Sequence, residues 1–217
     1  MKLPIYIESP APNFKRFFML GGALLLALAI AGQLLWPSMV LQFGILCLAA
    51  VSLISVGIAK HFEPPISVSL TENSVRYFHR YGQWKLAWTN ISRIHIPRFY
   101  HQLEHREISY IGVKVDDLEA LIDNVSPRFA SRIIHEHRDI LALAISQGDI
   151  NAAQAQINLS PFKLPSGFQI AGPLAPFFHQ MILLEKLYGA HLFIPFSGFT
   201  TSPQEVVNQM NAIRKMR

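Results

Sequence analysis

The sequence is poor in the residue patterns that catalysis and metal binding require. Its 217 residues include one cysteine, Cys47, which excludes an intrachain disulfide and a cysteine-based zinc site and is typical of a reducing compartment. It contains no glycine-rich phosphate loop, Gly-x-Ser-x-Gly elbow or dinucleotide-binding fingerprint. His135 and His137 are two residues apart, so on a helix they point about 200° apart and do not form a metalloprotease motif. We therefore predict no catalytic residues, no metal site and no cofactor.

Charge is missing from two long stretches near the N-terminus. Residues 17–36 and 39–58 contain no Asp, Glu, Lys or Arg, and only Pro37 and Ser38 separate them. A bilayer core about 30 Å thick requires about 20 apolar residues in a helix, so each stretch is long enough to span it. The sequence predicts a two-helix transmembrane hairpin over residues 17–58.

The flanks of these stretches differ in charge. Lys2, Lys15, Arg16 and Lys60 lie at the ends opposite the short connection, which itself carries no charge. An excess of Lys and Arg in short flanks is typical of the cytoplasmic side. We therefore expect a multi-pass membrane protein with both termini in the cytoplasm.

Two other interpretations compete with the hairpin. Lys15 and Arg16, followed by an apolar run and the small residues at 29–31, resemble a signal peptide, although the run is longer than the usual apolar region of about 7 to 15 residues. Two buried helices of a soluble core would normally show a polar face, and these stretches show none.

Beyond Lys60 the hydrophobic period changes to two, which is typical of strands with one buried face. Residues 61–217 have the length of a single ordinary domain, and the tail over 1–16 is predicted to be irregular and cytoplasmic. The alternation predicts a five-stranded antiparallel meander, with Gly82 and Gln83 as a two-residue turn. Its strands are expected at 66–70, 75–81, 84–88, 91–96 and 108–115, with a polar loop over 97–107.

Helix start and stop signals follow the strands. Asp116 predicts an N-cap with Glu119 three residues later, which explains the acidic residues 116–123 without a metal. Ser126 and Pro127 predict the start of a longer helix that Gly148 ends. Further expectations are a short helix at 149–158, a loop at 160–176, an apolar helix at 177–188, a strand at 190–196 and a last helix that begins at the capping box 202–205 (SPQE).

The run 84–91 (WKLAWTNI) with Ile94, and the late run 202–207 (SPQEVV), resemble the bacterial pleckstrin-homology-like (PH-like) domains. Such domains are often tethered behind two membrane spans. The resemblance implies a bent sheet closed by a C-terminal helix. The fold class is therefore a membrane α-helical hairpin plus an α+β domain, in which an antiparallel PH-like sheet carries a helical insertion and a C-terminal capping helix.

The resemblance covers residues 66–115 and 190–217, and the section 117–189 departs from it. We interpret this section as the helical insertion. The whole chain also resembles an uncharacterised family of bacterial inner-membrane proteins, a domain-of-unknown-function family. That resemblance implies a place in the bacterial inner membrane.

Basic residues are unevenly distributed in a chain whose formal net charge is +5. Arg76, Arg80, Lys85 and Arg93 are expected on outer faces of their strands, where each is worth about 1 kcal/mol next to anionic lipid. These four residues are our candidates for lipid-headgroup contact. The alternative is a solvated face that only keeps the domain soluble. No nucleic-acid motif accompanies the charge, so no nucleic-acid partner is expected.

The preferred hypothesis is a non-enzymatic, membrane-anchored cytoplasmic interaction module whose partner is a protein or anionic lipid. The first alternative is a lipid-carrying or lipid-modifying protein with a pocket between sheet and insertion, where His179, Glu185 or His191 supply polar groups. The second is an accessory subunit of a membrane complex. The apolar helix at 177–188 is expected in the core, or, if exposed, as a groove for a lipid chain or partner helix.

Overall fold

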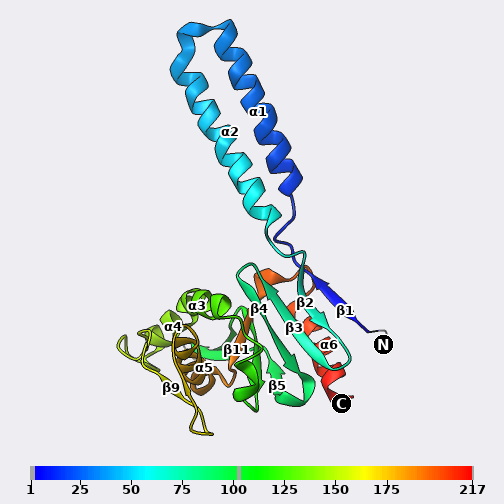
Figure 1. Cartoon of the computed structure of the whole chain (residues 1–217), viewed down its shortest axis with the longest axis vertical. Helices are drawn as coiled ribbons and strands as arrows, with labels where there is room; N and C mark the ends of the chain where they lie inside the picture. The colour runs from blue at the N-terminus through cyan, green and yellow to red at the C-terminus, as the bar shows by residue number, and fades with distance from the viewer. Residues whose placement is uncertain (1–2, 102–103, 217) are drawn as a thin grey trace. The chain divides into compact units, whose positions relative to one another are not determined.

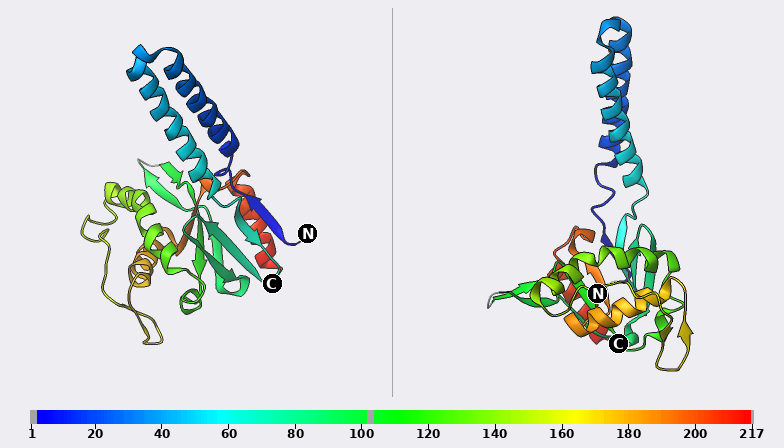
Figure 2. Two further views of the ribbon diagram at one scale, coloured as in Figure 1. Left: turned by 45° about the horizontal axis from the view of Figure 1, so that its top comes forward. Right: turned by 90° about the vertical axis from the view of Figure 1, so that its left-hand side faces the viewer.

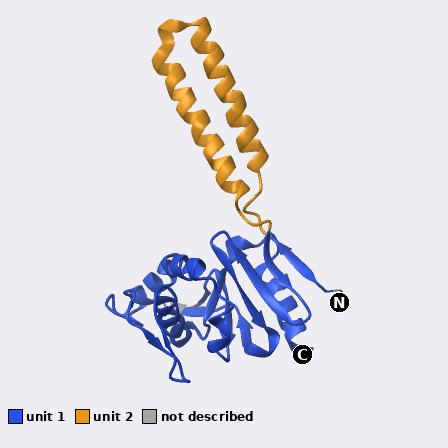
Figure 3. Ribbon diagram, in the orientation of Figure 1, with its two compact units in different colours: residues 1–8, 66–217 blue, residues 9–65 orange. Residues whose placement is uncertain are grey.

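The computed structural model describes residues 3–101 and 104–216. The chain separates into two compact units (Figure 3), the helical pair Ser9–Pro65 and a domain made of Met1–Glu8 and Ile66–Arg217. Lys2, one of the cations used to predict orientation, lies outside the described residues.

The helical pair consists of α1 (Lys15–Leu35) and α2 (Val40–His61), joined by a 3-10 turn at Pro37–Met39. The prediction of two apolar helices with a short connection is confirmed. The helices approach closely where small residues face large ones. A Cβ at position 22 would lie 2.7 Å from the Ile54 side chain, and one at position 32 would overlap the Phe43 ring.

Both helices are long and apolar enough to cross a membrane, by length and composition. Most of their large apolar side chains are exposed, including Leu20 and Leu41, which are 71% and 74% exposed. Helices of a soluble core bury such side chains, and a large exposed apolar surface needs another apolar phase to cover it. Association with a membrane follows from this exposure.

The first strand of the domain lies in the N-terminal tail. β1 (Ile5–Glu8) pairs antiparallel with β2 (Ile66–Leu70), with Ile7 opposite Val68. The prediction of an irregular tail is wrong here because Ile5 and Ile7 point into the core and complete one edge of the sheet. The helical pair is therefore a long insertion between two strands that are neighbours in the sheet.

A four-stranded sheet continues from β2 through β3 (Ser74–His79) to β4 (Gly82–Ala87) in the order β1-β2-β3-β4. His79 pairs with Gly82, so Arg80 and Tyr81 form the two-residue turn. The predicted turn at Gly82 and Gln83 is two residues too late.

The expected single meander is broken after β4. A 3-10 turn at Trp88–Asn90 redirects the chain, and the indole N–H of Trp88 donates to the Thr71 carbonyl at 2.9 Å. The next strand, β5 (Ile91–His95), pairs with β8 (Tyr110–Val115) instead of β4, and β8 pairs with β11 (Leu192–Pro195). The result is two antiparallel sheets, of four and three strands. No closed barrel forms among the described residues.

The expected polar loop between β5 and β8 contains a hairpin. β6 (Arg98–His101) pairs with β7 (Glu104–Glu107), and Nη2 of Arg98 lies 2.9 Å from Oε1 of Glu107.

The insertion between β8 and β11 is helical, as expected, but more broken. A 3-10 turn, Glu119–Leu121, replaces the first predicted helix and has no side-chain cap. The side chain of Asp117, not Asp116, accepts from the Glu119 N–H at 2.8 Å just before it. The long predicted helix divides at His137 into α3 (Pro127–Glu136) and α4 (Arg138–Gln147). Its boundaries are confirmed, because Ser126 caps α3 and Gly148 ends α4 in the left-handed conformation.

The later part of the insertion contains no helix at 149–158. It continues with a small hairpin of β9 (Phe162–Lys163) and β10 (Gln169–Ile170) and with α5 (Leu174–Tyr188), which Gly189 ends. α5 packs on α3, and its side chains at 177, 178, 181 and 184 are buried, so its expected place in the core is confirmed.

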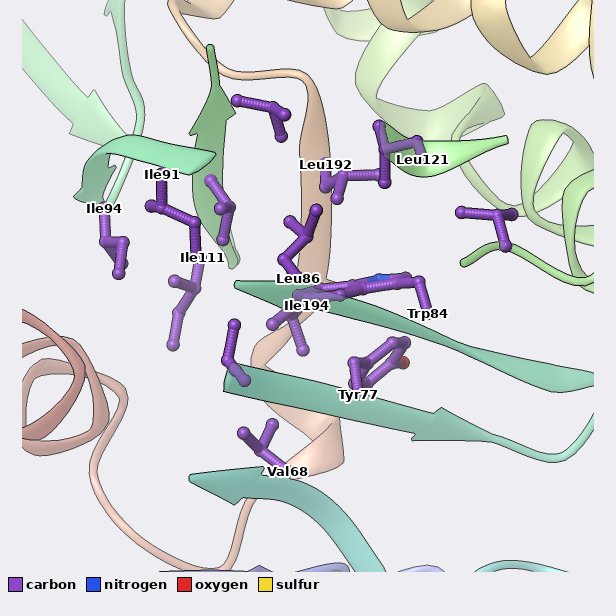
Figure 4. Packing of buried hydrophobic residues seen from close by; sticks show 14 of the residues in the cluster. Val68, Tyr77, Trp84, Leu86, Ile91, Ile94, Ile111, Leu121, Leu192 and Ile194 are labelled. Carbon is purple, nitrogen blue, oxygen red and sulfur yellow. The ribbon is translucent and has the colours of Figure 1, made fainter. Parts of the chain in front are cut away.

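The last helix, α6 (Pro203–Lys215), packs on β5 through hydrogen bonds from Asn211 and Arg214 to β5 carbonyls. Ser202 makes no side-chain capping bond, so the predicted capping box does not form. Helices α3 to α5 gather at one side of the sheets and α6 at the other (Figures 1 and 2). The main core lies between the two sheets, where Leu86 lies close to Ile194 and the Tyr77 ring lies beside Trp84 (Figure 4).

Candidate functional site

Two of the four predicted lipid-contact residues are direct neighbours. Arg76 of β3 and Lys85 of β4 are paired positions, so their side chains leave the same face of the four-stranded sheet. Tyr6 and Ser69 continue the row across β1 and β2. This is the outer face, since the alternate residues of each strand point into the core.

The outer face is hollowed around this row into a cavity of about 480 Å³. Arg76 lies with its guanidinium carbon 5.8 Å from the centre of the Phe78 ring. The lining combines cations, hydroxyl groups and aromatic rings: Tyr6, Ser69, Thr71, Asn73, Ser74, Arg76, Phe78 and Lys85. Such a lining suits a polar anionic group better than an apolar ligand.

The other two predicted residues lie elsewhere. Arg80 is in the β3–β4 turn. Arg93 is in β5 of the three-stranded sheet, opposite Lys114, where it lines a separate polar cleft of about 700 Å³ with His95 and Asn211. Arg93 therefore does not share an outer face with Arg76 and Lys85, because the break after β4 places it in another sheet.

The turn brings in a cation that the sequence did not predict. Tyr81 lies between the guanidinium groups of Arg80 and Arg132, whose central carbons are 4.5 Å and 4.8 Å from the ring centre. Both guanidiniums donate to the phenol oxygen, Arg132 at 3.2 Å. These hydrogen bonds, first that of Arg132, lower the pKa of Tyr81. Because Tyr81 and Arg132 are 51 residues apart, no local sequence pattern predicts this contact.

The histidines of the insertion have structural roles. Glu136 lies 3.3 Å from Nε2 of His79, and this hydrogen bond lowers the pKa of the carboxyl group. His137 is buried, and its Nδ1 lies 3.3 Å from Oε1 of Gln180, whose amide nitrogen donates to the Ile134 carbonyl. Burial lowers the pKa of His137 to about 4, so the ring is neutral at pH 7.

The model of a family described as "Protein of unknown function (DUF2982)" matches residues 68–216, from β2 to the end of α6. The chain belongs to the DUF2982 family. No curated protein and no solved structure matches the chain. The matched DUF2982 region contains both sheets except β1, together with the whole insertion, so β1 and the helical pair lie outside it.

The polar residues of the lipid-pocket alternative do not converge in this DUF2982 domain. His179 lines a cavity of about 230 Å³ inside the insertion and contacts the Ser160 carbonyl at 3.1 Å. Glu185 instead accepts from Lys114 at 2.8 Å, which lowers the pKa of Glu185. His191 accepts from the Val115 N–H through Nδ1, and burial lowers its pKa. Within the described ranges, no group of His, Cys, Asp and Glu is arranged to hold a metal ion.

Proposed function

We propose that the chain is a membrane-anchored, non-enzymatic interaction module whose domain contacts anionic lipid headgroups. The observation that carries this proposal is the place of the helical pair, which is inserted between the paired strands β1 and β2. The domain is thus held by two chain connections that leave neighbouring strands. Glu8 and Ile66, where they leave, are paired positions.

The connections are short. α2 ends at His61 and β2 begins at Ile66, so four residues link them, and an extended chain reaches at most about 3.5 Å per residue. Cations at this end of the domain therefore lie within reach of the surface potential of an anionic leaflet, which extends over about 8–10 Å. Arg80, in the turn at this end, is one residue that we assign to headgroup contact. The paired Arg76 and Lys85 lie three residues further from this end along β3 and β4, and we assign them to the same contact through their shared outer face.

We further propose that the membrane is a bacterial inner membrane and that both termini lie in the cytoplasm. The support is the charge of the flanks, with Lys15, Arg16 and Lys60 opposite an uncharged connection. A PH-like domain is part of the proposal. Its support is the order of a four-stranded sheet, a three-stranded sheet and the C-terminal helix α6.

The lipid-carrier alternative has less support. A cavity of about 450 Å³ does lie between β8 and α4, but none of His179, Glu185 and His191 lines it. The exposed apolar faces of α1 and α2 are compatible with an accessory subunit of a membrane complex as well as with lipid. Co-purification of a stoichiometric membrane partner in mild detergent would favour that alternative.

The test uses the full chain, because a fragment that begins at residue 61 lacks β1 and leaves β2 as a bare edge. Native mass spectrometry of the protein released from mixed micelles counts the anionic and zwitterionic lipids that it retains. We expect preferential retention of phosphatidylglycerol, reduced in Arg76→Glu/Lys85→Glu but not in the matched control Lys163→Glu/Lys186→Glu. Equal retention of both lipid classes by the unmodified chain would contradict headgroup recognition.

Orientation is tested separately. A reporter active only in the cytoplasm, fused after Arg217, should be active. If a reporter that is active only in the periplasm is fused at the same position and shows activity, the proposed topology is wrong.

A further inference from the structure

The β3–β4 turn lies at the end of the four-stranded sheet from which the chain leaves for α1 and α2. Glu8 and Ile66 mark the two points of departure and are paired. The antiparallel register of β2 and β3 places the Ile66 end of β2 beside the His79 end of β3. Arg80 and Tyr81 follow immediately as the turn. Connectivity therefore places this turn at the end of the sheet from which the chain departs for the two apolar helices.

The turn and α3 together present an excess of positive charge. Arg80, Arg132 and Arg128, which lies one helical turn before Arg132 on the same face of α3, are all exposed. Glu136 of α3 accompanies them; it accepts a hydrogen bond from His79 and also interacts electrostatically with Arg80. Arg132 has no carboxylate partner in the part of the chain that the structure describes. Its hydrogen-bonding partner in the cluster is the phenol oxygen of Tyr81.

Two guanidinium groups held on one neutral oxygen repel each other, and a shared anion would relieve that repulsion. A guanidinium presents several N–H donors in a fixed planar fork that matches the oxygens of a phosphate group. The Tyr81 hydroxyl holds both forks and has its own proton to donate. The cluster thus places two guanidinium groups and one hydroxyl donor next to each other at the Tyr81 oxygen.

We propose that Arg80, Tyr81 and Arg132 form the site for the phosphodiester of an anionic phospholipid headgroup. This inference rests on the proposed function and deepens it, because it assigns recognition to the turn and to a residue of the insertion. The occupant is a membrane lipid because the site lies at the end of the sheet that is tied to α1 and α2. Arg132 of α3 also gives the helical insertion a part in membrane contact.

The experiment is hydrogen exchange of the full chain in nanodiscs, read at the amides of residues 80–83. One set of nanodiscs contains phosphatidylcholine alone, the second also contains phosphatidylglycerol, and the third is phosphatidylcholine with added inorganic phosphate. We expect slower exchange at the turn only in the second set. In these anionic nanodiscs, Arg132→Glu should raise the exchange rate of the turn amides by about fivefold or more. That factor corresponds to roughly 1 kcal/mol per basic residue at an anionic surface. The matched control Lys163→Glu, a charge reversal in β9, should leave it unchanged.

The outcomes separate this inference from the proposed function. Slow exchange in all nanodiscs, or in the anionic set despite Arg132→Glu, would overturn the site. A slowdown produced by inorganic phosphate would overturn the lipid as its occupant. Anionic lipid could instead slow exchange in β3 and β4, with Arg76→Glu/Lys85→Glu abolishing that effect. This result would support the proposed function and would overturn the site at the turn. If lipid composition changes nothing anywhere, both are overturned.

Discussion

The four-stranded sheet and the helical insertion bury their interiors in different ways. The inner face of the sheet is apolar and aromatic, with Val68, Leu70 and Trp84 at most 1% exposed. The insertion encloses a polar pair, His137 and Gln180, each of which depends on the other for a hydrogen bond. We infer that the sheet is stabilised mainly by removal of apolar area from water, and the insertion also by specific polar contacts that depend on protonation.

The largest effect is expected in the sheet. Trp84→Ala removes an indole that packs 5.8 Å from the Tyr77 ring and should lower the free energy of unfolding by about 3–5 kcal/mol. The measurement is urea unfolding of the full chain in mild detergent, followed by circular dichroism. Trp36→Ala, at a residue that is 56% exposed beside the helix connection, is the control and should leave the domain transition unchanged. A loss below about 1 kcal/mol at Trp84 would contradict the apolar account of the sheet.

The next effect is a pH dependence in the insertion. Burial lowers the pKa of His137 to about 4 in the folded state, from the ordinary histidine value of 6.5. The unfolded chain therefore binds the proton more readily, and stability is lost as pH falls from about 6.5 to about 4. From 1.36 kcal/mol per pKa unit, the loss is roughly 3 kcal/mol.

His137→Gln isolates this contribution, because glutamine does not titrate and keeps a polar group. The slope of unfolding free energy against pH should flatten between about pH 6.5 and pH 4, relative to the unmodified chain. His135→Gln, at an exposed position in the last turn of α3, is the matched control and should keep the slope. An unchanged slope in His137→Gln would show that the titration belongs to another group.

A smaller effect compares two serines that precede a proline at helix starts. Ser126 accepts from the Phe129 N–H at 3.3 Å, whereas Ser202 makes no side-chain capping bond. Ser126→Ala should therefore cost about 1 kcal/mol, and Ser202→Ala clearly less. Thermal unfolding of both variants under one condition measures the difference. Equal losses would mean that the observed capping bond contributes nothing.

The smallest effect is expected for an ion pair between the three-stranded sheet and the insertion. Lys114 of β8 and Glu185 of α5 form a partly exposed ion pair at 2.8 Å. Partly exposed pairs of this kind contribute about 0–1 kcal/mol, so Glu185→Gln should change the unfolding free energy by less than about 1 kcal/mol. The small loss should shrink further in high salt, which screens exposed charges. A salt-independent loss of several kcal/mol would indicate that the pair holds the insertion to the sheet.

Prediction from the sequence succeeded where a local pattern has one physical meaning. The alternation in β2 to β5 and β8 identified the strands, because a period of two separates a buried face from an exposed one. The Ser126 cap and the terminal Gly148 and Gly189 were found for similar local reasons. Long-range pairing was not found. β1 pairs with β2 across the 57 residues of the helical pair, and no local signal indicates that these two segments pair.

The candidate site shows the same division. Strand alternation predicted Arg76 and Lys85 on the outer faces of their strands, but that they are paired neighbours depends on the register of β3 and β4, which the misplaced turn had shifted. Arg93 was misplaced, because the turn at Trp88–Asn90 sends β5 into the other sheet. Arg132 was missed, because its contact with Tyr81 depends on how α3 packs beside the β3–β4 turn.

The sequence by itself determined the two apolar helices, the α+β class and the lack of catalytic motifs, since each depends on composition or on a short repeat. Only the tertiary structure decided that the helices interrupt a pair of strands, that seven strands divide between two sheets, and that Arg132 meets Arg80 at Tyr81. The reason is that hydrophobic periodicity specifies which face of an element is buried, whereas the partner that buries it is selected by packing across the whole chain.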